Sequence, residues 1–264
     1  MTPSRNRLGP LSAGALPLAA SVLFAGQWLA GGRIGTLFQL DAALVVLGGT
    51  LAALAVSYPV ATLRRAVSAI PVVFAPQRAS ADAIVARFTD FAIRVRKRGV
   101  MSLENEIARA DDPFMARTLG LLVDGTAAED LRRALKIASD AMQDGDEELA
   151  EVFEAAGGYA PTLGILGAVL GLMHVMENLA APAKLGAGIA VAFVATVYGV
   201  ATANLIFLPI AMRLRVTARE RAVTREAIIE GAIALQQGMH PRLLEAQLDG
   251  FIRAAAETRV AKAA

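Results

Sequence analysis

Long stretches without charged residues alternate with charged segments along the chain. Two of the uncharged stretches, residues 155–176 and 185–212, are separated only by the short connector 177–184, which contains Pro182. Each is long enough to cross a hydrocarbon core about 30 Å thick at about 1.5 Å per helical residue. This pattern predicts a transmembrane helical hairpin around which the rest of the chain is organised.

Two more uncharged runs, residues 8–32 and 42–63, come earlier in the chain. Because the first follows a basic start, a cleaved signal peptide is the alternative interpretation. The run is longer than a typical signal-peptide core, which favours a retained helix. The sequence therefore predicts an all-α integral membrane protein with four transmembrane helices in two hairpins.

Composition agrees with a membrane protein, since 55% of the residues are hydrophobic, only 19% are charged and the mean hydropathy is +0.50. A net charge of +2 is too small to indicate a nucleic-acid partner. The chain has no cysteine and only two histidines, His174 and His240, so we expect no disulfide framework, no metal site and no cofactor. The spans hold no Ser–His pair and no acidic dyad, which argues against an enzyme.

The positive charges predict the orientation, because loops rich in Lys and Arg stay in the cytoplasm. One predicted side of the membrane holds only Arg33 and Lys184. The other side holds the basic residues Arg5, Arg7, Arg64, Arg65, Arg213, Arg215, Arg219 and Arg221. We therefore expect both termini and the long middle segment to be cytoplasmic.

These runs divide the chain into four predicted parts. They are an N-terminal segment with the first hairpin (1–63), a cytoplasmic helical domain (64–154), the second hairpin (155–212) and a cytoplasmic helical tail (213–264). We expect the helical domain and the tail to pack against each other.

The two predicted cytoplasmic parts contain residues typical of helix starts and helix ends. Ser80 and Ser102 are predicted N-caps, Gly99 is a predicted C-terminal stop, and Asp112-Pro113 is a predicted cap and first-turn pair. Thr126 and Glu129 form a predicted capping box, and the helix that follows it continues towards the membrane, with a possible break at Gly145.

Small and polar residues share the second hairpin. Gly167 and Gly171 have the spacing that lets membrane helices approach closely. Ordinary packing within one subunit is the first interpretation. An interface with other subunits that exposes a polar route is the second, and it is favoured by the polar residues Thr196, Tyr198, Thr202 and Asn204 of the last span.

The central parts of the spans hold no Asp, Glu, Lys or Arg, although ion carriers normally need an ionisable group there. If the protein moves ions, a partner must therefore supply the titrating carboxylate. Pro161 and Pro209 bracket the second hairpin, either as ordinary membrane-helix prolines or as hinges.

Four motifs occur in order along almost the whole chain. They lie in LGGTLAALAVSYP, in RKRGVMSLENEIARADDPFMARTLGLLVDGT, in AAGGYAPTLGILGAVLGL and in ATVYGVATANLIFLPIA. Together they resemble the flagellar-stator members of the MotA/TolQ/ExbB channel family. That resemblance implies a homo-oligomer, a pentamer, in the lipid of the bacterial inner membrane. The resemblance further implies that the pentamer surrounds two copies of a MotB-type partner, which supplies the ion-carrying aspartate, and that ion flow drives the pentamer against the rotor protein FliG.

The resemblance also assigns roles to individual residues. Arg96 and Glu104 match the family's rotor-facing charges, with Lys97 beside them, although both signs also suit the helix dipole at those positions. Pro161 and Pro209 match the two prolines tied to coupling, which favours the hinge interpretation.

The predicted ion route contains Thr196, Ala168 and Tyr198. Thr196 matches a threonine near the family's route, and Ala168 stands where sodium-type members usually carry threonine. An alanine has no oxygen to replace the hydration of sodium, so we predict proton coupling. Relatives often carry an acidic residue near Ala138, and this chain departs from that pattern.

Two rival functions remain open. An ExbB/TolQ-type energiser of outer-membrane transport typically has three spans and an external N-terminus, which the first hairpin argues against. A non-conducting membrane scaffold is the other rival, and it predicts that Thr196 and Pro209 are functionally silent while the interface glycines matter.

Overall fold

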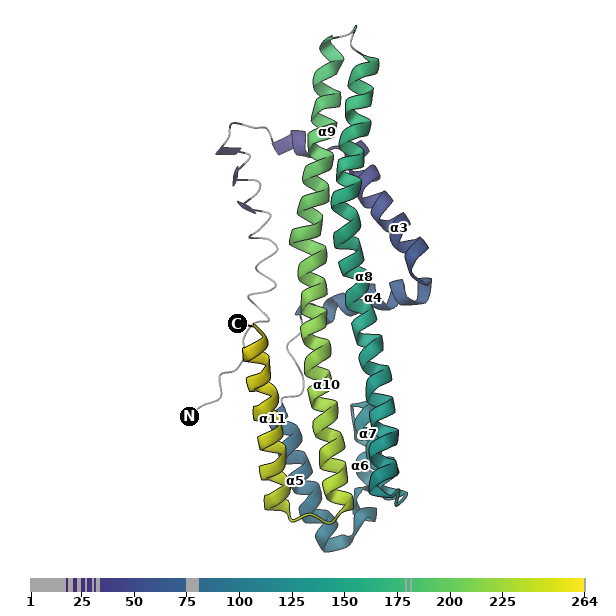
Figure 1. Ribbon diagram of the computed structural model, residues 1–264, viewed down its shortest axis with the longest axis vertical. Helices are drawn as coiled ribbons and strands as arrows, with labels where there is room; N and C mark the ends of the chain where they lie inside the picture. The colour runs from purple at the N-terminus through teal and green to yellow at the C-terminus, as the bar shows by residue number, and fades with distance from the viewer. Residues whose placement is uncertain are drawn as a thin grey trace. The chain divides into compact units, whose positions relative to one another are not determined.

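The computed structural model describes residues 34–74, 81–178, 180 and 182–263, together with residues 18, 21, 22, 25, 26, 28, 29 and 31. All regular secondary structure in this part of the chain is helical (Figure 1), which confirms the all-α class. Most of the first uncharged run and the predicted cap Ser80 lie outside the described residues.

The chain forms two compact units. The first contains Met1–Pro76 and Asp146–Val216, and the second contains Gln77–Gly145 and Thr217–Ala264. These boundaries follow from packing, whereas the four predicted parts follow from where uncharged runs end. The ranges 1–63, 64–154, 155–212 and 213–264 therefore stay predictions.

Three described stretches are long and apolar enough to cross a membrane: Leu40–Ser57, Ala128–Glu177 and Gly188–Gln236. They overlap the second and fourth predicted spans and contain the third. The helices concerned are α2 (Leu40–Ala43), the π-helical η2 (Leu44–Gly48), α3 (Gly49–Ser57), α8 (Ala128–Glu177), α9 (Pro182–Thr202), the π-helical η4 (Ala203–Phe207) and α10 (Leu208–Gln236).

The second uncharged run is not one continuous helix. Within residues 42–63, α3 stops at Ser57 and α4 (Val60–Phe74) starts a new helix. Tyr58 between them is extended, with φ −129° and ψ 145°. The ring of Pro59 disfavours helical geometry in the residue before it, so the helix breaks there. Figure 1 shows α4 turning away from the line of α3.

Apolar side chains from several helices form the core of the first unit near α4. Ala66 and Val73 of α4 are buried in a cluster with Phe153 of α8 and Leu214 of α10. By contrast α8 itself runs through Gly145 without interruption, so the possible break there does not occur. α8 thus carries the membrane run and a long charged segment as one helix.

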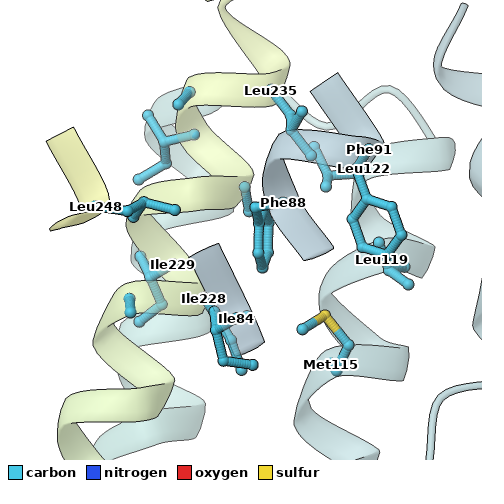
Figure 2. Close-up of a cluster of buried hydrophobic side chains, with 14 of the residues drawn as sticks. Ile84, Phe88, Phe91, Met115, Leu119, Leu122, Ile228, Ile229, Leu235 and Leu248 are labelled. Atoms are coloured by element: carbon cyan, nitrogen blue, oxygen red, sulfur yellow. The ribbon is translucent and has the colours of Figure 1, made fainter. Parts of the chain in front are cut away.

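The second unit has a core of large apolar side chains. It comprises α5 (Ala81–Arg98), the 3-10 helix η3 (Val100–Leu103), α6 (Glu104–Ala108), α7 (Pro113–Val123), α11 (Pro241–Ala263) and parts of α8 and α10. Figure 2 shows Phe88 of α5 between Ile229 of α10 and Leu119 of α7, all three fully buried or nearly so. Side chains of the middle segment and of the tail thus share one core.

Two of the predicted helix ends in this unit are observed. The Asp112 side chain accepts a 2.9 Å hydrogen bond from the Phe114 N–H at the start of α7, and Gly99 after α5 has a φ of 77°. Ser102 is not the predicted N-cap, because its hydroxyl donates to the Gly99 carbonyl at 2.7 Å. The intervening 3-10 turn brings that carbonyl within reach, and α6 begins without a side-chain cap.

Candidate functional site

Glycines bring α8 and α9 into backbone contact within the first unit. A Cβ atom on Gly199 would lie 2.5 Å from the Ala160 carbonyl oxygen, and one on Gly171 would lie 2.9 Å from the Ala192 nitrogen. Only hydrogen fits at such separations, so the two helices touch without intervening side chains. For these glycines, the structure supports the interpretation of packing within one subunit.

The polar side chains of the last span form hydrogen bonds along their own helix. Thr202 Oγ1 donates to the Tyr198 carbonyl at 2.7 Å, and Asn204 Nδ2 donates to the Val200 carbonyl at 2.9 Å. Such internal bonds satisfy polar groups where lipid offers no partner. Within a single subunit, these groups therefore have partners before any ion arrives.

Thr196 and Ala168 lie near the seam between α8 and α9. Thr196 is half-buried, and its hydroxyl donates to the Ala192 carbonyl at 3.3 Å. A Cβ on Gly164 would lie 3.4 Å from the Thr196 Cα, and half-buried Ala168 follows Gly164 by about one helical turn. Both predicted route residues are thus placed on neighbouring turns of the packed hairpin.

Tyr198 ties the last span to the start of the second. Its hydroxyl donates to the Leu37 carbonyl at 2.5 Å and accepts a 3.3 Å bond from the Gln39 N–H. The sequence placed Tyr198 on the polar route and missed this contact. No local signal could have revealed it, because Leu37 and Tyr198 are 161 positions apart.

Both predicted coupling prolines lie inside continuous helical stretches. Pro161 is inside α8, and its Cα would be 3.1 Å from a Cβ on Gly199. Pro209 is the second residue of α10, directly after the π-helical η4. A proline has no N–H, so the helix loses a backbone hydrogen bond at each place, and π segments are likewise sites of local deformation. The last span therefore combines two helix irregularities within one short segment.

A group of polar contacts joins the helices at the charged end of the first unit. Arg215 binds both carboxylate oxygens of Glu154, at 2.7 and 2.5 Å, and this fork geometry favours a strong pair. Glu148 accepts a 3.1 Å bond from Thr62 and lies 3.6 Å from Arg65. Sequence reasoning missed these pairs. Its one available signal was the regular spacing of acidic residues in EELAEVFE, just before the third predicted span.

The three predicted rotor-facing charges are all exposed. None of the ion pairs in the described part of the chain involves Arg96, Lys97 or Glu104. Arg96 and Lys97 lie in the last turn of α5, and Glu104 lies in the first turn of α6. Both signs suit the helix dipole, and the side chains are still free to meet a partner.

Their neighbours are paired instead. Arg94 Nη1 donates to Glu106 at 2.9 Å, and Glu106 is largely buried. The hydrogen bond from Arg94 holds the pKa of Glu106 below its ordinary value, and the same bond raises the pKa of Arg94. This surface thus contains one locked ion pair beside three charges that form no such pair.

Two further predictions concern single positions. Ala138, where relatives often carry an acidic residue, packs partly buried against the core of the second unit. Among the described residues, no group of three His, Cys, Asp or Glu side chains is arranged to hold a metal ion. The expectation that no cofactor is bound stays a prediction.

Comparison with known proteins gives consistent results. The profile of the MotA/TolQ/ExbB proton channel family matches residues 106–227. Motility protein A of Bacillus subtilis strain 168 is 32% identical over 232 residues, which cover 88% of this chain and 86% of that protein. Two solved complexes have similar folds. The C. jejuni MotAB structure has a TM-score of 0.85 at 27% identity and covers 93% of this chain and 95% of its own. The MotAB stator complex of B. subtilis has a TM-score of 0.83 at 31% identity and covers 91% and 95%.

Proposed function

Because the chain belongs to the MotA/TolQ/ExbB proton channel family, we propose that it is a flagellar stator subunit of the bacterial inner membrane. With a MotB-type partner it forms a proton channel and converts proton flow into torque on the rotor. The observation that carries this proposal is the likeness to two solved MotAB complexes over 93% and 91% of the chain. The subunit moves ions and catalyses no covalent step.

The missing ionisable group supports a two-component channel. The uncharged runs 155–176 and 185–212 contain no carboxylate that could carry a proton. The MotB-type partner supplies it, and the route runs past Thr196, Ala168 and Tyr198. Ala168 offers no side-chain oxygen to a sodium ion, which favours protons as the coupling ion.

Assembly and orientation follow the family pattern. Five copies surround the partner, each with four spans, and the exposed apolar side chains on α8 (Ile165, Leu166, Val169, Leu170, Leu172 and Met173) are available for contact with lipid or neighbouring subunits. Both termini lie in the cytoplasm, on the side where the basic residues gather.

Torque requires a route from the ion to the rotor. Pro161 and Pro209 are the coupling elements, because each interrupts the hydrogen-bond ladder of a spanning helix. Arg96, Lys97 and Glu104 meet the rotor protein FliG, since all three are exposed and form no ion pair within the described part of the subunit.

The test is deletion of the gene followed by scoring of swimming and staining of flagella. We expect intact but paralysed flagella, rescued by the wild-type gene and not by Pro209→Ala. Pro71→Ala is the matched control, because Pro71 also lies inside a helix, in α4, and is assigned no role. Rescue that persists without sodium supports proton coupling.

Other outcomes point to the rivals. Cells that swim but fail in energised uptake or envelope integrity would assign the protein to the ExbB/TolQ branch. Full rescue by both Pro209→Ala and Thr196→Ala would favour a non-conducting scaffold.

A further inference from the structure

Two arginines near the end of α5 and two glutamates on α6 lie on either side of the junction between these helices. Arg94 and Arg96 are two residues apart on α5, and Glu104 and Glu106 are two residues apart on α6. Two residues turn a helix by about 200°, so the members of each couple point to opposite sides. Burial agrees, because Arg94 and Glu106 are partly covered whereas Arg96 and Glu104 are exposed.

The covered couple forms the centre of a dense polar contact. Arg94 donates to Glu106 at 2.9 Å and to Asp90 at 2.8 Å, and its guanidinium lies 5.1 Å from the centre of the Phe91 ring. Arg87 and Arg109 each approach Glu106 to 3.8 Å. Glu106 thus faces three guanidinium groups and Arg94 faces two carboxylates, and such a network holds its geometry far better than a single exposed pair.

Apolar and polar contacts both connect α6 to α5. The link η3 follows Gly99, whose φ of 77° makes a sharp turn; its Leu103 is fully buried, and Ile107 of α6 packs against the same core. Met101 in the middle of the link is 62% exposed. Glu106 therefore provides the polar connection from α6 back to α5, through Arg87 and Arg94.

We propose that Glu106 is a positioning residue for torque generation: its ion pair with Arg94 fixes α6 against α5, and so sets the separation and direction of Arg96 and Glu104. The Arg94–Glu106 pair holds α6 in place against α5, and Arg96 and Glu104 face the rotor. This inference rests on the proposed function as a stator subunit.

The physical reason is preorganisation. Exposed ion pairs between flexible surfaces contribute little, because ordering the side chains offsets the attraction. Charges held in advance at the correct separation avoid part of that loss. If α6 is no longer held against α5, Arg96 and Glu104 are still present and exposed, but the distance and direction between them vary.

The test uses cells that lack the chromosomal gene and express the full chain with its partner. Stall torque per stator is measured from tethered beads for Glu106→Gln, Glu104→Gln and the double variant. Glutamine keeps the shape of Glu106 and removes its charge, and we expect stall torque to fall about threefold or more, since charge-assisted hydrogen bonds are among the stronger ones. Stator number per motor and proton leakage stay at wild-type values.

The double variant separates positioning from a general loss of fold. If Glu106 acts through the outer charges, the double variant loses less torque than the product of the two single losses. A loss equal to that product, or wild-type torque in Glu106→Gln, overturns the inference. If Glu106→Gln does not accumulate, Arg94→Lys takes its place in the same cycle, because lysine keeps the charge but not the fork.

Two controls complete the design. Glu129→Gln removes a carboxylate whose side chain is 88% exposed and whose ion pair, at 3.5 Å, is with Arg133 on the surface of the same helix. We therefore expect wild-type torque from this variant. Failure of the wild-type gene to restore rotation would reject the proposed function itself. Rotation with wild type but no effect of Glu106→Gln would reject only the positioning role.

Discussion

The two compact units achieve close packing by opposite means. All of the largest fully buried side chains among the described residues, among them Phe88, Phe114 and Leu131, belong to the second unit. In the first unit, glycines instead lie directly against the backbone of a neighbouring helix, as where a Cβ on Gly199 would lie 2.5 Å from the Ala160 carbonyl oxygen. One unit interdigitates large side chains, and the other brings helix backbones together.

The solvent explains this difference. In water, burying a large apolar side chain is favourable because it removes apolar surface from the solvent. Lipid tails are as apolar as leucine, so no such gain exists between membrane helices, and close van der Waals contact takes its place. The contrast therefore supports a membrane location for the hairpin and an aqueous one for the second unit, without reference to any relative.

The largest effect is expected from Phe88, at the centre of the apolar core of the second unit. Phe88→Ala should lower the free energy of unfolding of the second unit by about 3–5 kcal/mol, because it leaves a cavity between α5, α7 and α10. Ile93→Ala on the same helix removes a side chain that is 41% exposed and should have a much smaller effect. Hydrogen exchange of α10 and α11 amides in the detergent-solubilised complex measures both. Equal losses would break the comparison.

The glycine contacts between α8 and α9 predict that a Gly→Ala substitution there has the opposite of its usual effect on stability. Replacing glycine with alanine inside a helix normally stabilises it by about 1 kcal/mol. Gly199→Ala should instead destabilise the hairpin by about 1–3 kcal/mol, because the new methyl group meets the Ala160 carbonyl and forces the helices apart. Gly186→Ala on α9 has open space around it and should be neutral or stabilising. Thermal melting of the two variants in detergent decides, and stabilisation by both would disprove backbone contact.

Much of this architecture could be predicted from local features. Uncharged length predicts α8 and α9, because crossing a bilayer is a requirement on consecutive residues. Asp112 starts α7 through its side-chain cap, and Gly99 ends α5 through its positive φ. The break after Ser57 was also present in the sequence as Pro59, but hydropathy continues smoothly across it.

The rest depends on contacts between distant residues. Tyr198 bonds to Leu37 across 161 positions, and Arg215 to Glu154 across 61. Neither spacing carries a periodic signal, since each pair forms only after the helices have packed. The candidate site shows the same limit: the exposure of Arg96 follows from its place in the last turn of α5, whereas the partly buried Arg94–Glu106 pair could not be predicted from local sequence.

The pH dependence of stability provides a third test of the difference between the two units, because the second unit also depends on the partly buried Arg94–Glu106 ion pair. The pKa of Glu106 lies below its ordinary value of 4.5 in the folded chain, so its contribution is complete above that value and is lost as the pH falls through the lowered pKa. Glu106→Gln should cost about 1–2 kcal/mol near neutral pH.

The difference from wild type should shrink as the pH falls below 4.5. Melting curves of the second unit at several pH values follow it, with the exposed Glu129→Gln as the matched control. A gap that stays constant down to low pH would mean that Glu106 contributes through shape rather than charge.

The smallest effect concerns helix ends, which the two units also treat differently. Gln39 at the start of α2 makes no side-chain cap, whereas Asp112 caps α7 through the Phe114 N–H. Asp112→Ala should lower the stability of the second unit by about 1 kcal/mol, because that N–H then has to find water or remain unpaired. Asp111→Ala, one residue earlier, removes an equal charge without removing the cap and should be nearly neutral. Hydrogen exchange at the first turn of α7 measures the difference directly, and equal exchange in the two variants would show that the charge, not the cap, matters there.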